Sequence, residues 1–176
     1  MLGWTARLLN ELSGDDYAIV VAALFHDSGY DYSNAREHAR ESAIVCRGYL
    51  TGIGMDEELM DKIVELVAGH SHKEISAYAL SMDLQILMDA DLLDELGATI
   101  MLWDAMGEGS KQQGNYYTTL NRIRYAYEKL IYVRRSIKTS VGGRYYDEGL
   151  EYLKYALGRL EFELQPELLD LFADDN

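Results

Sequence analysis

The chain has 176 residues, of which 48% are hydrophobic and 26% are charged, a composition typical of one globular domain with a substantial core and not of a disordered chain. Its formal charge of −14 repels nucleic-acid phosphates and anionic lipid headgroups, so we expect neither nucleic acid nor membrane as a partner. No apolar run approaches the roughly 20 residues of a membrane-spanning helix, and the N-terminal residues lack the pattern of a secretory signal, so we expect a cytoplasmic protein.

Helical periodicity runs through most of the sequence. Apolar residues recur at intervals of three and four, no segment has the alternation of a strand, and the one proline, Pro166, falls near the C-terminus. We therefore predict an all-α fold, a single-domain helical bundle over residues 1–176. The expected helices cover, in chain order, about residues 2–12, 15–27, 33–50, 57–70, 83–103, 120–137 and 150–164.

The starts of three helices are predicted from capping residues. Asp15 or Asp16 precedes the second apolar stripe, and Ser33 or Asn34 precedes the third. Asp56 precedes the fourth. Aspartate, asparagine and serine are preferred N-caps because their side chains accept hydrogen bonds from the free N–H groups of the first turn.

Two segments are predicted to lack helical structure. Residues 105–115 contain three glycines and almost no apolar side chains, which is typical of a surface connection and less often of a lid. Residues 138–144 are predicted to form a turn before the last helix. Beyond that helix, Pro166 occupies the position at which a further short helix would begin.

The adjacent pair His26-Asp27 is the most informative feature for function. It follows an apolar run, residues 18–25, at the point where the second helix leaves the core. His70 at the end of the fourth helix and Asp91 in the fifth have matching chemistry, because a divalent ion used for hydrolysis prefers imidazole and carboxylate ligands with one position left for water. Adjacent helical residues point about 100° apart, so His26 and Asp27 can share an ion only where the helix end bends or the ion lies between them.

These residues resemble the motif of the HD-domain phosphohydrolase superfamily, in which a first histidine, an adjacent His-Asp pair and a later aspartate are carried on a bundle of helices. His26-Asp27 within AALFHDSGY matches the pair, and Asp91 within DADLLDELGA matches the final acidic ligand. His38 is similar to a histidine that often follows the pair, and His70 is similar to one that many members carry between the motifs.

The resemblance covers nearly the whole chain. It implies a motif core at about residues 1–105 and C-terminal helices at about 114–172, whose tail is similar to that of small stand-alone members. It also implies a metal-dependent hydrolase, and more specifically a phosphohydrolase that attacks a small phosphoester or nucleotide with a metal-activated water. The divalent cofactor would be Mn, Fe, Co, Ni, Zn or Mg.

The resemblance assigns roles to individual residues. His26, Asp27 and Asp91 would hold the metal ion, and Asp27 would also contact the attacking water as the catalytic residue. His38 and His70 would contact a second metal ion or the phosphorylated substrate. The charged neighbours of His38, however, favour a surface group on an exposed helix face.

Three further residues lie near the expected site in the sequence. Tyr30 follows the pair closely and is the tyrosine expected to line the site. His72 competes with His70 for one inward position and is equally well explained by exposure to solvent. Asp94 lies one turn beyond the expected acidic ligand and would orient a ligand or cap locally, whereas Asp89 faces elsewhere on the helix.

One ligand of the family pattern is absent from the sequence. No histidine precedes His26, whereas members of the superfamily carry a metal-binding histidine one helix earlier, which would fall upstream of Met1. Either the natural protein begins further upstream, which the abrupt start of the first apolar stripe favours, or the site has lost a ligand. Two other functions stay open: a di-iron oxygenase, as some relatives of the superfamily are, with His38 and His70 as extra ligands, and a non-catalytic module that binds a ligand or a partner, which the missing histidine supports.

The remaining composition gives two further expectations. The single cysteine, Cys46, cannot form an intramolecular disulfide and is expected to be a buried apolar side chain. The 14 tyrosines are expected at helix interfaces or on the surface of a homodimer.

Overall fold

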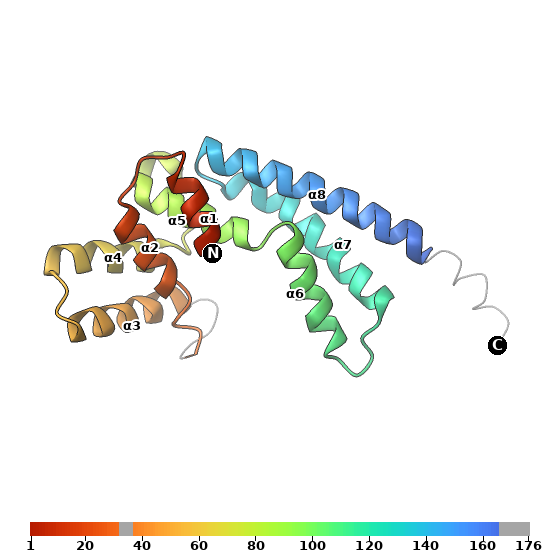
Figure 1. Cartoon of the computed structure of the whole chain (residues 1–176), viewed down its shortest axis with the longest axis horizontal. Helices are drawn as coiled ribbons and strands as arrows, with labels where there is room; N and C mark the ends of the chain where they lie inside the picture. The colour runs from red at the N-terminus through yellow and green to blue at the C-terminus, as the bar shows by residue number, and fades with distance from the viewer. Residues whose placement is uncertain (32–36, 166–176) are drawn as a thin grey trace. The chain divides into compact units, whose positions relative to one another are not determined.

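The computed structural model describes residues 1–31 and 37–165, and within these ranges all regular structure is helical (Figure 1). The elements are, in chain order, α1 (Leu2–Leu9), α2 (Asp16–Phe25), α3 (His38–Gly52), α4 (Glu57–Gly69), the 3-10 turn η1 (Ala77–Ala79), α5 (Met82–Asp94), α6 (Ala98–Gly109), α7 (Tyr116–Val133), the 3-10 turn η2 (Arg134–Ser136) and α8 (Ser140–Leu164). The prediction of an all-α fold is confirmed. None of the helices in the described ranges has the length and apolarity needed to cross a membrane.

The helices form two compact units. The first comprises Met1–Asp94 together with Ser136–Arg144, and the second comprises Glu95–Arg135 and the chain from Tyr145 on. α8 therefore begins in the first unit and continues into the second. The single domain expected from the sequence stays a prediction.

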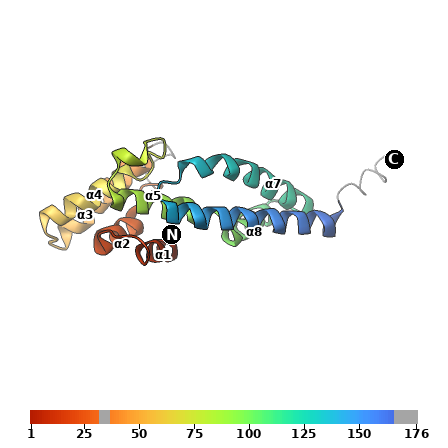
Figure 2. The same ribbon diagram turned by 90° about the horizontal axis from the view of Figure 1, so that it is seen from above.

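In the first unit, α4 packs against α2 and α3, and α1 packs against α5. Figure 2 shows α3 and α4 side by side from a second direction. The following apolar side chains are fully buried in this unit: Leu8, Ile19, Leu50, Ile63, Ile86, Leu87 and Met88. Cys46 is buried as well, as predicted.

Two helices of the first unit begin at their predicted caps. The carboxylate of Asp15 accepts a hydrogen bond from Ala18 N at 3.1 Å at the start of α2. The carboxylate of Asp56 accepts one from Leu59 N at 3.1 Å at the start of α4. Each bond satisfies a backbone donor that the helix itself leaves unpaired.

In the second unit, α6 packs against α7, and apolar side chains join α7 to α8. The core contains Leu120, Ile123 and Leu157, with Met101, Tyr127, Leu160 and Leu164 packed against them. The buried Tyr146 of α8 donates a hydrogen bond from its hydroxyl to the carbonyl oxygen of Leu130 at 3.0 Å. Asp104 of α6 is buried and accepts a hydrogen bond from Arg122 Nε at 3.0 Å.

The helix predicted over residues 83–103 is wrong, because the chain breaks between α5 and α6. Gly97, the residue before α6, has φ 73° and ψ −144° there, a conformation that favours glycine. α6 then runs to Gly109, so the loop predicted over 105–115 is wrong in its first half. Asn115 caps α7 through its side chain, which accepts hydrogen bonds from two backbone N–H groups.

The turn predicted over residues 138–144 is also wrong, because α8 begins at Ser140 and continues through both glycines of this segment. Gly142 permits a close approach between elements and does not form a turn: a Cβ at this position would meet Asp89 Oδ2 at 2.3 Å. The last helix therefore has 25 residues.

Two sequence predictions concern residues that the structure does not describe. The caps Ser33 and Asn34, and the short helix expected from Pro166, lie outside the described residues. α3 begins at His38 in the structure, with Glu37 before it.

Candidate metal centre

The pair His26-Asp27 lies in the turn that follows α2, because α2 ends at Phe25. His26 Nδ1 donates a hydrogen bond to the carbonyl oxygen of Ala23 at 2.9 Å. This bond directs Nε2 toward the neighbouring carboxylate, and Nε2 lies 3.2 Å from Asp27 Oδ2. The two side chains therefore come together at the point where the regular helix has ended.

The turn after this pair is held tightly against α3. Gly29 N donates a hydrogen bond to Ser42 Oγ at 2.8 Å, and a Cβ on Gly29 would meet the carbonyl oxygen of His38 at 2.3 Å. Only glycine allows two backbones to approach this closely. The contact brings the start of α3, and with it the His38 side chain, next to Asp27.

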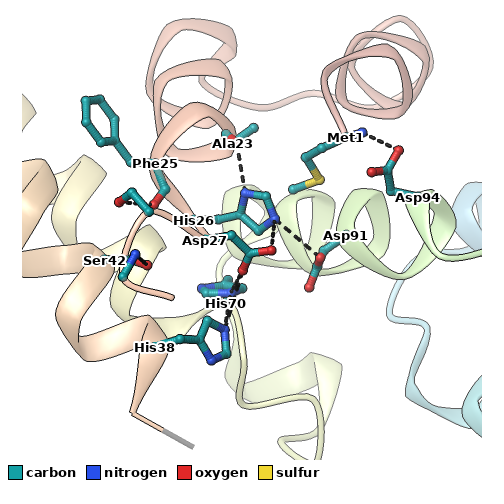
Figure 3. Close-up of polar contacts among 12 residues, drawn as sticks. Met1, Ala23, Phe25, His26, Asp27, His38, Ser42, His70, Asp91 and Asp94 are labelled. Atoms are coloured by element: carbon teal, nitrogen blue, oxygen red, sulfur yellow. Dashed lines mark hydrogen bonds and ion pairs between the residues drawn. The ribbon is translucent and has the colours of Figure 1, made fainter. Parts of the chain in front are cut away.

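Asp91 of α5 faces the same imidazole. Its Oδ1 lies 3.5 Å from His26 Nε2, and Lys73 Nζ lies 2.5 Å from its Oδ2. We call His26, Asp91 and Oδ2 of Asp27 the first half-site; Figure 3 shows these three side chains converging.

His38 and His70 lie near the other oxygen of Asp27. His38 is the first residue of α3, His70 follows the end of α4, and their Nε2 atoms are 3.1 Å apart. Asp27 Oδ1 lies 3.6 Å from His38 Nε2 and 3.7 Å from His70 Nε2 (Figure 3). Both histidines are buried, so the expectation that His38 is a surface group is wrong. We call His38, His70 and Oδ1 of Asp27 the second half-site.

The donor atoms fit divalent ions. His70 Nδ1 donates to the carbonyl oxygen of Val67 at 2.6 Å, as His26 Nδ1 does to its own helix. In the neutral rings, Nε2 of each histidine therefore carries a lone pair directed at Asp27. Acceptors that face acceptors in a buried cluster need a proton or a metal ion between them. The ligand atoms of Asp27, His38 and His70 all lie within 4.8 Å of one another, which is close enough to share an ion.

The charges of the centre also favour a cation. Burial opposes protonation of His26, but hydrogen bonds and charge from Asp27 and Asp91 outweigh burial and raise its pKa to about 10. Burial opposes ionisation of Asp91, but His26 and Lys73 outweigh it and lower the Asp91 pKa to about 2. The pKa of Asp27 is also lowered, because hydrogen bonds and charge from His26 and His70 outweigh burial. Both carboxylates are thus ionised near neutral pH, as metal ligands must be.

The other sequence candidates lie at different distances from the centre. The Tyr30 ring stacks on the His38 ring, with centroids 4.3 Å apart and planes inclined by 11°, and so lines the second half-site. His72 is exposed and pairs with a neighbouring glutamate. Asp94 pairs with the amino group of Met1 and with neither half-site.

Asp89 faces away from the centre, as predicted, and anchors a distant segment of the chain. Its buried carboxylate accepts hydrogen bonds from Lys138 N at 2.7 Å and from Thr139 N and Oγ1 at 2.8 and 2.7 Å. Lys138 Nζ donates in turn to the carbonyl oxygens of Lys73 and Ile75 at 2.6 and 2.7 Å. The segment that carries Lys73, the lysine paired with Asp91, is therefore held in place by residues just before α8.

Sequence reasoning missed three residues that shape the centre: Gly29, Ser42 and Lys73. The glycine carries a usable signal, because a glycine in a tight turn just after a candidate ligand indicates close backbone approach. Ser42 and Lys73 carry none, since most serines on helices and most lysines in irregular segments lie on the surface and take no part in a site.

Comparison with known proteins identifies the fold and the family. Two solved structures are similar over most of the chain. The Lin1889 protein from Listeria innocua is 22% identical, with a TM-score of 0.65 over 94% of this chain and 84% of that chain. YpgQ from Bacillus subtilis is 17% identical, with a TM-score of 0.70 over 94% of this chain and 86% of that chain. No curated protein matches the sequence.

At these low sequence identities, the two structural similarities show only that the fold is shared. The sequence profile of the HD domain matches residues 1–96 of the 176. This range contains every residue of both half-sites. The chain therefore belongs to the HD-domain family, which includes metal-dependent phosphohydrolases.

Proposed function

We propose that the protein is a metal-dependent phosphohydrolase that cleaves a small phosphoester or a nucleotide. The observation that carries the proposal is the position of Asp27, whose Oδ2 faces His26 while its Oδ1 faces His38 and His70. A carboxylate placed in this way could hold two cations close together. Paired metal ions stabilise both the attacking and the leaving oxygen in phosphoryl transfer.

The two half-sites have the ligands that this chemistry needs. His26, Asp91 and one oxygen of Asp27 would hold one ion, and His38, His70 and the other oxygen of Asp27 would hold a second. A divalent ion at such a position lowers the pKa of a bound water toward neutrality and offsets the negative charge of a phosphate. That charge matters in a chain with a formal charge of −14, which otherwise repels phosphorylated substrates.

The chain's own groups determine how a substrate reaches the centre. The Asp27 side chain is 49% exposed, whereas those of His26, His38 and His70 are 13%, 9% and 1% exposed. Solvent and substrate therefore approach on the side of Asp27. The buried histidines hold their ring orientation through neighbouring groups: His26 and His70 through backbone carbonyls and His38 through the stacked ring of Tyr30.

The proposal is tested by elemental analysis of the protein after dialysis without chelator, together with hydrolysis of a panel of phosphoesters and nucleotides. We expect near-stoichiometric transition metal in the wild type. Asp27→Ala should lose the metal and lower hydrolysis on the order of 100-fold or more. His72→Ala is the matched control, because this histidine is exposed and lies outside both half-sites, and it should change neither quantity.

Full metal-dependent hydrolysis in Asp27→Ala would contradict the proposal. The same ligands suit iron, so bound iron together with oxygen consumption would instead favour a di-iron oxygenase. Protein that takes up no divalent ion from any source would favour a non-catalytic member of the family.

A further inference from the structure

A lysine occupies part of the first half-site. Lys73 Nζ lies 2.5 Å from Asp91 Oδ2 and 3.4 Å from the carbonyl oxygen of Met88. Its side chain is only 19% exposed, so water screens this charge weakly. The ammonium group is therefore a cation already paired with one oxygen of a carboxylate whose other oxygen faces His26.

The position of this lysine is fixed by the surrounding backbone. Lys138 Nζ donates hydrogen bonds to the carbonyl oxygens of Lys73 and Ile75, on either side of one residue. The N–H of Lys138 is itself bonded to the buried Asp89. Lys73 thus belongs to a braced segment, and its ammonium group cannot leave Asp91 without a loss of partially buried contacts.

The two half-sites consequently differ in charge. In the first, the ammonium of Lys73 offsets the negative charge of Asp91. Within the described part of the chain, Asp27 forms its ion pairs with histidines alone, and no lysine or arginine is paired with it. The second half-site also has two buried imidazoles whose Nε2 atoms already lie 3.1 Å apart.

We propose that Lys73 sets the order in which the metal centre fills: the second half-site takes the first ion, and the first half-site takes a later ion more weakly. The reason is electrostatic, because an ion bound to Asp91 Oδ1 would lie close to an ammonium held on Oδ2 of the same carboxylate. The inference rests on the proposed metal centre and adds which of its two half-sites binds a metal ion more tightly. It also makes Lys73 a residue that acts on metal affinity through Asp91.

The test is a titration of the metal-stripped full chain with Mn²⁺, followed by electron paramagnetic resonance. The wild type should bind one ion tightly and a second at least about tenfold more weakly, with spin coupling between two ions appearing only at the second step. His38→Ala should abolish the tight ion. His26→Ala should leave it and abolish the weak one.

The lysine is tested by three substitutions. Lys73→Met keeps an unbranched side chain of similar bulk but removes the charged terminal group, and it should tighten binding of the second ion about tenfold while leaving that of the first unchanged. Lys73→Arg should keep the gap between the two affinities. Lys62→Met makes the same change of net charge in the first unit at a lysine paired with Asp15 and Asp83, and it should leave both affinities unchanged.

Three outcomes would overturn this order of filling. If Lys73→Met leaves the difference between the two Mn²⁺ affinities unchanged, or weakens binding of the second ion, the lysine only orients Asp91. The proposed function still stands in that case. If His26→Ala abolishes the tight ion, the order is the reverse of the one proposed. Wild-type protein that binds no Mn²⁺ at any concentration would remove the inference and the Mn²⁺ centre together.

Discussion

His26 links the metal centre to pH. Its pKa is raised from 6.5 to about 10, because Asp27 and Asp91 outweigh the effect of burial. A group whose pKa is raised in the folded state stabilises the fold fully below its unfolded pKa and loses that contribution as the pH rises. The metal-free protein should therefore lose stability between pH 6.5 and about 10.

This pH dependence is measured by urea unfolding of the metal-stripped protein across that range. His26→Gln should flatten the curve, since the amide does not titrate, and an unchanged slope in this variant would assign the effect to other groups. The affinity of the first half-site for a metal ion should instead increase with pH over the same interval, because the ion must displace the proton on His26 Nε2.

At the residue scale, the sequence predicted the positions with a motif and missed those that depend on tertiary placement. His26, Asp27 and Asp91 are brought together as their pattern indicated. The burial of His38 was not predictable, because it follows from the close approach at Gly29. Nor was Lys73, whose reach to Asp91 depends on a segment braced from much later in the chain.

Gly29 determines how closely α2 and α3 approach. A Cβ there would meet three backbone atoms of α3, the oxygen of His38 at 2.3 Å, the nitrogen of Ser42 at 2.4 Å and the carbonyl carbon of Glu41 at 2.9 Å, and none can move without shifting α3. Gly29→Ala should lower the free energy of unfolding by about 1–3 kcal/mol or more. It should also weaken metal binding, because the shift of α3 displaces the His38 side chain.

Gly48→Ala, in α3, is the control. Nothing lies within 4 Å of a Cβ at Gly48, so the substitution should stabilise α3 by about 0.4–1 kcal/mol. Unfolding by urea measures both variants, and a Mn²⁺ titration measures the metal effect. Equal stability of the two variants would show that the approach at Gly29 is not tight.

Helix starts with a local chemical cause were predictable, as the caps Asp15 and Asp56 show. Helix boundaries that depend on neighbours were not. In the sequence, the two glycines after Lys138 suggest a turn. In the structure, Gly142 lies within α8, and the reason for a glycine there is that Asp89 leaves no room for a side chain. A glycine required for packing and a glycine required for a turn cannot be distinguished until the neighbouring element is known.

At the scale of the whole molecule, Asp89 joins α5 to the start of α8. Asp89→Ala would leave two backbone N–H groups and the Thr139 hydroxyl without their acceptor, in a buried place. We expect a loss of about 3 kcal/mol or more in the free energy of unfolding. Thr139→Ser keeps the hydroxyl and serves as the control, with an expected loss of about 1 kcal/mol at most.

The same variants can be followed by metal titration, because the Asp89 contact leads through Lys138 to the segment of Lys73. Asp89→Ala should narrow the gap between the two Mn²⁺ affinities as the lysine loses its brace. Wild-type stability in this variant would exclude a structural role for the contact. No pattern in the sequence predicted it, since 49 and 50 positions separate the partners.

The first unit is discontinuous in the chain, and this has a consequence for its synthesis. Every ligand of the metal centre has been translated by the end of the matched HD segment at residue 96, but the unit also needs Ser136–Arg144. At about 5–20 residues per second, a nascent chain would wait roughly 2–10 s before those residues exist. During that interval Asp89 has no partner from α8 and Lys73 has no brace, so the part of the protein that is made first is completed late.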